Sequence, residues 1–184
     1  MERAKQKGIP LRAGREFSFC LGMATRVEIL SLYVSAGHDF KGRHGKPRRH
    51  NPVPAVETVE CVAGKGIRGD RYFSFKENYK AQVTLFDEAV HKAVQEEFGT
   101  NHTPDVYRRN LFIRGIDLNE LIGKSFKLGE VRFEGVQECT PCYWMDEAVA
   151  PGTEEFLKGR GGLRTRVLTN GTLCLGETSL ETFD

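Results

Sequence analysis

Short segments with the character of β-strands follow one another through most of this 184-residue chain, and they constrain its fold more than any other feature. They are rich in apolar and β-branched residues, and some alternate apolar with polar positions, as a strand with one buried face does. The segments are residues 27–35, 56–62, 81–86, 111–114, 126–133, 164–168 and 172–175. Many short strands with little helix predict a mostly β fold, closed or nearly closed into a β-barrel.

Two dipeptides mark where strands should reverse. Gly129-Glu130 separates apolar residues at positions 126, 128, 131 and 133, which predicts a hairpin. Asn170-Gly171 separates residues 164–168 from residues 172–175, and this dipeptide tolerates positive φ at both central positions, as a type I′ turn requires. We therefore expect a second hairpin at Asn170-Gly171.

One segment has the pattern of a full helix. Asp87 is a suitable N-cap, apolar residues at positions 90, 93, 94 and 98 share one face, and Gly99 is a suitable end. Shorter helical turns are expected at residues 119–122, after the capping residue Asp117, and at residues 154–158. The helices of this protein should therefore be few and short.

The length and composition indicate one soluble domain. Hydrophobic residues make up 39% and charged residues 28%, both ordinary values for such a domain. We expect residues 23–184 to form this domain, and residues 1–22 to be a disordered tail or sequence upstream of a start at Met23. Lys and Arg number 27 against 25 Asp and Glu, so the net charge of +2 gives no support for nucleic-acid binding. The basic run at residues 41–50 lacks interleaved aromatic residues and is interpreted as a solvated loop.

The sequence also indicates a compartment. No apolar run reaches membrane-spanning length, and the apolar stretch at residues 17–21 is too short for the core of a signal peptide. Five cysteines, an odd number without the spacing of a disulfide framework, indicate a reducing environment. We therefore expect a cytoplasmic protein with no membrane partner.

The strongest chemical feature is the segment ECTPCYW at residues 138–144. A thiolate is a nucleophile, a soft metal ligand and a carrier of sulfane sulfur, and two cysteines at this spacing can exchange a disulfide. A thioredoxin-like redox pair would lie between a strand and a helix of an α/β fold, and structural zinc would need a second pair of ligands that the sequence does not offer. The spacing alone leaves two interpretations open: buried structural cysteines, or one reactive thiol with the other as its resolving partner.

Motifs around this pair, spread from residue 27 to residue 177, resemble the MOSC family, named for the C-terminal domain of molybdenum-cofactor sulfurases. The motifs are GIRGDR at 66–71, QVTL at 82–85, RRNL at 108–111 with GIDL at 115–118, LIGK at 121–124 followed by Leu128-Gly129, Pro141-Cys142, and Arg160-Gly161-Gly162 with LGE at 175–177. Each motif is short, but their joint order and spacing are typical of that family.

The resemblance implies a MOSC-like β-barrel with a few short α-helices and identifies Cys142 as the functional cysteine. In that family the thiolate carries sulfur as a persulfide or holds the molybdenum cofactor (molybdopterin), so Cys142 would be the nucleophile or the metal ligand. Cys139 lies outside the shared motif and would be the resolving catalytic partner. We expect a stand-alone module, without the pyridoxal-phosphate domain of the fused sulfurases or the ferredoxin-type domain of other relatives. We therefore expect a pyridoxal phosphate-linked pathway in which a cysteine desulfurase is the separate sulfur donor.

A set of cofactor-binding residues follows from the same motifs and from side-chain chemistry. Glycines permit tight turns or a close backbone approach to a ligand, and guanidinium and amide groups offer donors to a phosphate-bearing pterin. The predicted set is Gly66, Gly69, Asp70, Arg71, Arg109, Asn110, Arg160, Gly161 and Gly162. The structural alternatives are an Asx-type turn at Asp70, a carboxylate partner for Arg109 and a strand-end cap by Asn110.

The sequence therefore predicts a sulfur carrier that delivers sulfur from a Cys142 persulfide to molybdenum cofactor or to a metal–sulfur assembly protein. The first alternative is a molybdenum-cofactor-binding reductase of N-hydroxylated compounds, with Cys142 as metal ligand and an external electron donor. The second is a non-catalytic binding module with structural cysteines. Whether the chain is an enzyme depends on which of these holds.

Overall fold

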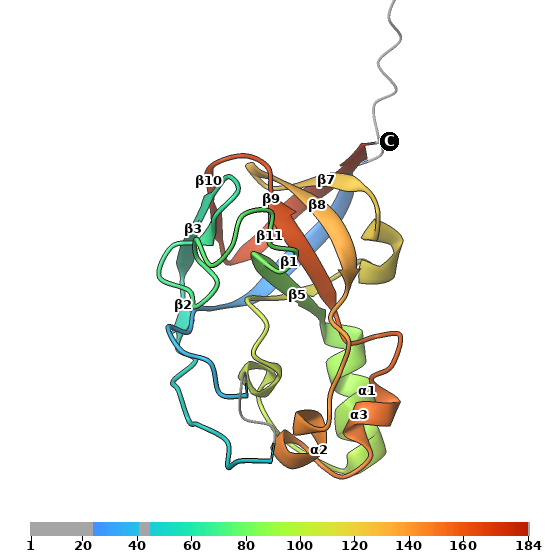
Figure 1. The fold of residues 1–184 in the computed structure, drawn as a ribbon. Helices are drawn as coiled ribbons and strands as arrows, with labels where there is room; N and C mark the ends of the chain where they lie inside the picture. Colours follow the sequence, from blue (N-terminus) through green and yellow to red (C-terminus); the bar gives the residue numbers. More distant parts are fainter. Residues whose placement is uncertain (1–23, 41–44, 184) are drawn as a thin grey trace, which may run out of the picture.

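The computed structural model describes residues 24–40 and 45–183, and in these ranges the chain is mainly β (Figure 1). The expected tail at residues 1–22 and part of the basic loop, residues 41–44, lie outside the described residues. The strands are β1 (Thr25–Tyr33), β2 (Ala55–Val56), β3 (Thr58–Val62), β4 (Gly66–Ile67), β5 (Val83–Asp87), β6 (Leu111–Arg114), β7 (Ser125–Leu128), β8 (Val131–Glu138), β9 (Leu163–Val167), β10 (Gly171–Cys174) and β11 (Gly176–Phe183). The helices are α1 (Glu88–Phe98), α2 (Trp144–Ala148) and α3 (Thr153–Phe156), with 3₁₀ turns η1 (Pro104–Tyr107) and η2 (Leu118–Leu121).

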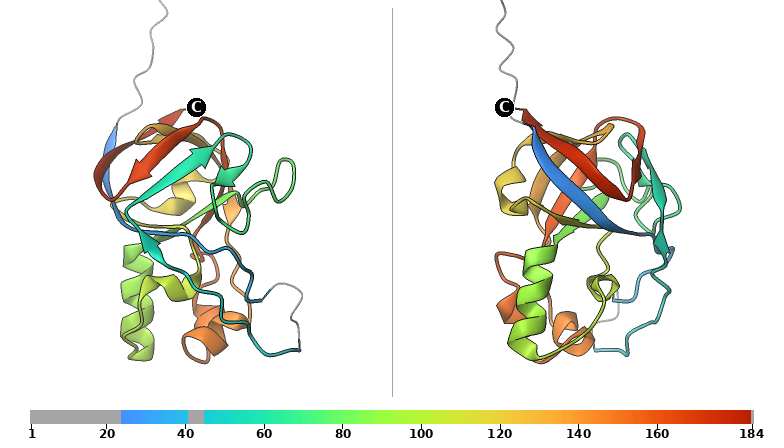
Figure 2. Two further views of the ribbon diagram at one scale, coloured as in Figure 1. Left: turned by 90° about the vertical axis from the view of Figure 1, so that its left-hand side faces the viewer. Right: turned by 180° about the vertical axis from the view of Figure 1, so that it is seen from behind.

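Within the described residues, seven strands close into a barrel in the order β11-β7-β8-β9-β5-β6-β1, and β1 pairs back onto β11. The neighbouring strands are antiparallel except for β5 and β6, which run parallel. A small sheet in the order β10-β3-β4 lies beside the barrel (Figures 1 and 2). Closure leaves the barrel without a free edge. The predicted mostly β barrel with a few short helices is confirmed.

Two apolar cores hold this fold together. The first fills the barrel and includes the buried residues Ile29, Leu85, Leu111, Phe126 and Phe133. The second lies between one end of the barrel and the helices, and it includes Phe86, Val94, Tyr107, Met145 and Leu157. Figures 1 and 2 show α1, α2 and α3 grouped at that end. In the described ranges, no helix has both the length and the apolar character to cross a membrane.

Helix α1 confirms the capping pattern of the sequence. The Asp87 carboxylate accepts a hydrogen bond from the backbone N–H of Ala89 at 2.9 Å, and Gly99 ends the helix with φ of 61°. Val94 is buried on the predicted apolar face. His91 is also buried there, which the apolar pattern did not include. The helix therefore brings a titratable ring into the second core.

The predicted hairpin at Gly129-Glu130 is confirmed, because it joins the paired strands β7 and β8. The predicted hairpin at Asn170-Gly171 is wrong: β9 pairs with β5 and β8, whereas β10 pairs with β3. Neither residue of that dipeptide has positive φ. Instead, the Asn170 Oδ1 atom accepts a hydrogen bond from the backbone N–H of Ala63 at 2.8 Å. A long-range contact therefore replaces the local turn.

Candidate functional site

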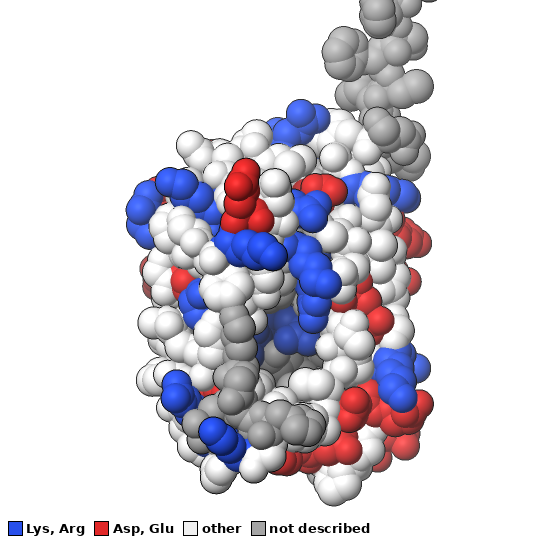
Figure 3. All heavy atoms as spheres, in the orientation of Figure 1, with Lys and Arg blue, Asp and Glu red and all other residues white. Residues whose placement is uncertain are grey.

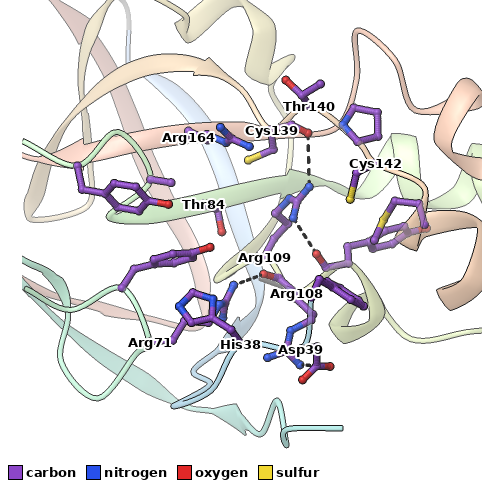
Figure 4. Close-up of a pocket in the computed structure, with 17 residues that line it drawn as sticks. His38, Asp39, Arg71, Thr84, Arg108, Arg109, Cys139, Thr140, Cys142 and Arg164 are labelled. Carbon is purple, nitrogen blue, oxygen red and sulfur yellow. Dashed lines mark hydrogen bonds and ion pairs between the residues drawn. The ribbon is translucent and has the colours of Figure 1, made fainter. Parts of the chain in front are cut away.

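A cavity of about 170 Å³ opens at the helical end of the barrel, and Cys142 lies on its wall (Figure 4). Its lining comes from segments far apart in sequence: the loop after β1, the segment between β4 and β5, the residues after η1, strand β9, and the Cys loop, which we define as residues 139–142. Figure 3 shows a hollow on this face with Lys and Arg side chains inside it and around its mouth. The arginines that line the cavity are Arg71, Arg108, Arg109 and Arg164. The cavity is therefore cationic.

The two cysteines of the Cys loop differ in accessibility. Cys139 is buried, Cys142 is exposed, and both are free thiols. Figure 4 shows the two sulfur atoms on opposite sides of the Arg109 guanidinium group. Cys142 is therefore the thiol of this loop that a molecule entering from solvent meets first.

Arg109 fixes the position of the Cys loop. Its Nε and Nη2 atoms both donate to the Gly161 carbonyl at 3.2 Å, and Nη2 also reaches the Cys139 carbonyl at 3.4 Å. Its Nη1 atom donates to the Tyr107 carbonyl at 2.9 Å. These bonds tie the segment after β8 to the segment before β9. The guanidinium lines the cavity, but its hydrogen bonds are directed to the protein backbone.

Gly161 and Gly162 let the backbone segments approach closely. A Cβ atom at position 161 would lie 2.2 Å from the Cys139 carbonyl oxygen, and one at position 162 would lie 2.3 Å from the Leu85 carbonyl oxygen. Gly162 also has φ of 97°, which side chains disfavour. The backbone N–H of Cys139 donates to the Gly162 carbonyl at 2.7 Å. The two glycines thus seat the Cys loop on the barrel, and contact of either with a cofactor stays a prediction.

Arg108 is buried and binds the loop after β1, which forms part of the cavity wall. It donates to the Asp39 carboxylate and the Asn51 carbonyl, each at 3.0 Å, and to Ser35 Oγ and the Gly37 carbonyl, each at 2.8 Å. Burial alone would raise the pKa of Asp39, but hydrogen bonds from Asn51 and the charge of Arg108 outweigh it and lower the pKa. The Arg108–Asp39 pair is therefore an internal ion pair that fixes the loop after β1.

Asp70 and Asn110 form a buried bridge that does not line the cavity. The Asn110 Nδ2 atom donates to the Asp70 carboxylate at 3.0 Å, and its Oδ1 accepts from the backbone N–H of Thr84 at 3.1 Å. The Asp70 carboxylate also accepts from the backbone N–H of Tyr72 at 3.0 Å, the Asx-type contact weighed above. These bonds hold Thr84, which lines the cavity, and the segment that carries Arg71. A direct cofactor contact by Asp70 or Asn110 stays a prediction.

Gly66, Gly69 and Arg160 also lie away from the cavity lining. Gly66 and Gly69 have φ of 104° and 84°, and a Cβ atom at position 66 would lie 2.7 Å from the Gln82 carbonyl oxygen. Arg160 is exposed, and its guanidinium lies 4.8 Å from the centre of the Phe156 ring. The glycines serve close packing and turning of the backbone here. A cofactor contact at these three residues stays a prediction.

Arg71 and Arg164 form the cationic wall that faces the cavity. Arg71 is only partly available, because it donates to the Arg108 carbonyl at 2.9 Å and to the Asp70 carboxylate at 3.4 Å. The Arg164 guanidinium makes no hydrogen bond or ion pair to any residue that the structure describes. Arg166 shares its strand face but binds the Glu134 carboxylate at 3.0 Å. Sequence alternation places both arginines on one face, and only the fold shows that Arg164 reaches the cavity.

An aromatic wall that the sequence analysis missed completes the cavity. Tyr72 and Tyr79 line it, with ring centroids 5.0 Å apart, and the Arg71 guanidinium lies 4.8 Å from the centre of the Tyr72 ring. Burial, with a contribution from Tyr72, raises the pKa of Tyr79 to about 12. Both rings come from the irregular segment between β4 and β5. That segment has no periodic pattern that could have placed them.

The other described cysteines lie outside the cavity. Cys61 is buried in the barrel core, where burial raises the pKa of its thiol to about 12. Cys174 is exposed on β10 and does not line the cavity. Cys20 is outside the described residues. Among residues 24–40 and 45–183, no group of three or more His, Cys, Asp or Glu side chains is arranged to hold a metal ion.

A closed β-barrel with an exposed cysteine in a cationic cavity at one end defines the class of this protein. The MOSC domain family model matches residues 42–178, and the chain belongs to this family. A search of the curated proteins finds no match.

Several solved structures are similar to this chain in fold. The chain is similar to YuaD from Bacillus subtilis, with a TM-score of 0.69 and 15% identity over 89% of this chain and 100% of that one. It is also similar to YiiM from Geobacillus stearothermophilus, with a TM-score of 0.63 and 16% identity over 86% and 75% of the two chains. For YiiM from Escherichia coli, the TM-score is 0.60 and the identity 16% over 88% and 70%. At these identities the likeness shows a shared fold.

Proposed function

We propose that this MOSC-domain protein is a sulfur carrier that holds one sulfur atom as a persulfide on Cys142. The observation that carries the proposal is the exposed Cys142 thiol on the wall of a cavity lined by arginines. A persulfide is an anion at neutral pH, and guanidinium groups stabilise such anions by charge and by hydrogen bonds. The sulfur chemistry implied by the family resemblance supports the same assignment.

The loading step is a thiol–persulfide exchange. The Cys142 thiolate attacks the terminal sulfur of a donor persulfide, R–S–SH. The donor S–S bond breaks, a new S–S bond forms at the Cys142 Sγ atom, and the donor leaves as a thiolate, so atoms and electrons balance. The donor that we propose is a cysteine desulfurase, and the acceptor is a molybdenum-cofactor or iron–sulfur assembly protein.

Cys139 provides a route for release. Its thiolate attacks the Cys142 Sγ atom of the persulfide, HS⁻ leaves, and a Cys139–Cys142 disulfide forms, which a thiol reductant returns to two thiols. Cys139 is buried, and in Figure 4 the Arg109 guanidinium lies between the two sulfurs. The Cys loop must move for this reaction. We therefore expect release through Cys139 to be slower than loading of Cys142.

Two variants test this division of roles. After incubation with a cysteine desulfurase and cysteine, wild type and Cys139→Ser should gain a persulfide, and Cys142→Ser should not. Cys139→Ser should also keep its persulfide longer than wild type, because it cannot form the disulfide that releases sulfide. Loss of loading in Cys139→Ser as complete as in Cys142→Ser would contradict the assignment.

The cationic wall favours a second candidate, a molybdenum-cofactor-binding reductase of N-hydroxylated compounds with an external electron donor. The donor set fits the group: the Cys142 thiolate would ligate the metal, and Arg71 and Arg164 would face the anionic phosphate. When bound, the cofactor supplies two-electron redox chemistry. The described residues offer no cluster of metal ligands, so the metal would have to bring its remaining ligands with it. Stoichiometric molybdenum and pterin in the purified protein would favour this candidate over the carrier.

A further inference from the structure

We propose that Arg164 is the anion receptor of the cavity and that its ligand is the small sulfur oxyanion thiosulfate, which supplies sulfur directly to Cys142. This inference rests on the proposed sulfur-carrier function and names a substrate class for it. Arg164 differs from the other arginines of the cavity in the partners of its guanidinium group.

Those other arginines are already engaged. Arg108 and Arg109 direct their guanidinium groups at the protein carbonyls and side chains described above, and Arg71 donates to Arg108 and Asp70. The Arg164 side chain lines the same cavity, and its guanidinium makes no hydrogen bond or ion pair to any described residue. A guanidinium group carries five N–H donors in a planar fork that matches the oxygens of an oxyanion. Arg164 therefore has its donors available for a ligand.

The backbone position of Arg164 is fixed even though its guanidinium group has no hydrogen-bond or ion-pair partner among the described residues. Its backbone is the second residue of β9, where it pairs with Thr84 of β5 and Gln137 of β8. The side chain is half-buried, so the unbonded charge lies at the cavity rather than in open solvent. A site on a paired barrel strand is held more rigidly than one on a loop.

The charges around the cavity favour an anion. Asp39 is the carboxylate among the described lining residues, and it already accepts hydrogen bonds from Arg108 and Arg48. The Tyr72 and Tyr79 rings also line the cavity and enclose part of it beside Arg71. Charge interactions are stronger in such a partly enclosed space than in bulk water. An anion that enters the cavity therefore meets positive charge that no described carboxylate neutralises at Arg164.

The presence of a thiol in the same small cavity narrows the choice of anion. Arg164 and Cys142 both line this cavity, and Figure 4 shows Arg164 beside Cys139, with the Arg109 guanidinium between that pair and Cys142. A ligand that uses both needs an anionic end for the guanidinium and an end that reacts with a thiolate. Thiosulfate has both, because its outer sulfane sulfur is bonded to a sulfonate group. Inorganic phosphate shares the charge but has no sulfur to give, so it serves as an inert competitor.

The transfer balances without another reagent. The Cys142 thiolate attacks the outer sulfur of thiosulfate, the S–S bond of thiosulfate breaks, and its electron pair leaves with sulfite. A persulfide anion remains on Cys142. Arg164 holds the sulfonate oxygens before the transfer and stabilises the sulfite as it gains charge.

The test measures sulfur loading of the full chain by intact mass after incubation with thiosulfate. Wild type should gain one sulfur atom. Arg164→Gln should load at least about tenfold more slowly, since it loses a charge-assisted hydrogen bond, and Arg164→Lys should fall between the two. Arg26→Gln is the matched control, because it removes an arginine whose side chain is 81% exposed on β1. Its loading rate should equal that of wild type, and thermal unfolding should show that all variants are folded.

Separate arms distinguish failure of this inference from failure of the proposed function. Loading of Cys142 by a cysteine desulfurase but not by thiosulfate would overturn the inference and leave the carrier standing. Loading by neither would overturn both. Equal thiosulfate loading of wild type and Arg164→Gln would remove Arg164 from the reaction.

A second readout tests the anion receptor without any sulfur transfer. Iodoacetate and iodoacetamide alkylate thiols by the same chemistry but differ in charge. In wild type, phosphate should slow alkylation of Cys142 by iodoacetate more than by iodoacetamide. In Arg164→Gln, the iodoacetate-to-iodoacetamide rate ratio should fall about tenfold. An unchanged ratio would show that Arg164 does not receive anions.

Discussion

Arg109 donates two hydrogen bonds to a single acceptor, the Gly161 carbonyl, from its Nε and Nη2 atoms at 3.2 Å each. The sequence analysis weighed Arg109 as a phosphate ligand or as the partner of a carboxylate, and the structure shows it bound to backbone carbonyls. One half-buried side chain thereby joins the chain before β9 to the Cys loop. The reactive thiol is positioned by contacts that reach across the fold.

Replacement of Arg109 should therefore loosen the Cys loop. We expect Arg109→Gln to lower the free energy of unfolding by roughly 2 kcal/mol, since hydrogen bonds to a charged donor are lost and buried carbonyls are left without partners. Urea unfolding measures this change. Arg160→Gln, at an exposed arginine in the neighbouring turn, should change it by less than about 0.5 kcal/mol. Equal effects of the two substitutions would contradict the role given to Arg109.

The close approach of the backbone at Gly161 to the Cys139 carbonyl leads to a second prediction. Gly161→Ala places a Cβ atom 2.2 Å from the Cys139 carbonyl oxygen, so the backbone must shift. We expect a loss of about 3 kcal/mol in the free energy of unfolding. Gly159→Ala is the matched control, because its Cβ would meet nothing within 4 Å and its cost comes only from φ of 77°. That cost should be about 1 kcal/mol, and a Gly161→Ala cost no larger would show that the Cys loop adapts freely.

Substitution of Asn110 tests whether this residue has a structural role or contacts a ligand. It is buried and bonded to Asp70, Thr84 and the Tyr33 carbonyl. Asn110→Ala should lower the free energy of unfolding by about 3 kcal/mol, because several buried polar groups lose their partner. Asn119→Ala, at an exposed asparagine with one bond to the Gly159 carbonyl, should cost about 1 kcal/mol or less. If chemical denaturation found Asn110→Ala as stable as wild type, the bridge would not be structural.

Two histidines, the buried His91 and the half-buried His102, should make stability depend on pH. His91 Nδ1 and His102 Nε2 lie 3.3 and 2.7 Å from the Tyr107 hydroxyl, and burial lowers the pKa of both below the ordinary 6.5. The unfolded chain takes up these protons near pH 6.5, whereas the folded chain resists them until lower pH. The stabilisation is therefore complete above pH 6.5 and declines as the pH falls below it.

Urea midpoints at about pH 7.5 and about pH 5.5 measure this effect. The midpoint should be lower in acid for wild type and for His50→Gln, which changes an exposed histidine. His91→Gln should show a smaller drop, because one of the two histidines with a lowered pKa no longer titrates. Equal midpoints at the two pH values in wild type would contradict the role of this histidine pair.

Much of the fold could be predicted because its signals are local. Strand alternation and the Asp87 and Gly99 caps need only neighbouring residues, and those elements lie close to their predicted ranges. Helix α2 was missed because its N-cap Tyr143 makes no capping hydrogen bond from its side chain and its first residue, Trp144, is a large aromatic. The Asn170-Gly171 dipeptide has the composition of a hairpin turn, but pairing of β10 with β3 overrides it.

The candidate site was less predictable because the contacts that build it are not local in sequence. The sequence analysis singled out Cys142 from the family resemblance, and Arg71 and Arg109 from the motifs that carry it, and all three line the cavity. It could not tell that the donors of Arg109 are used by backbone carbonyls, or that Arg164 and Tyr79 face the same space. Those facts depend on contacts between segments far apart in the chain, which only the closed barrel brings together.

The measurement that tests the central claim most directly is peptide mass analysis after incubation with a cysteine desulfurase and cysteine, compared among wild type, Cys142→Ser and Cys174→Ser. Cys174 is the matched control, since its thiol is exposed but lies outside the cavity. The account predicts one added sulfur on the Cys142 peptide in wild type and in Cys174→Ser, and none in Cys142→Ser. Added sulfur that persists in Cys142→Ser, or that appears on Cys174 at the same rate as on Cys142, would contradict it.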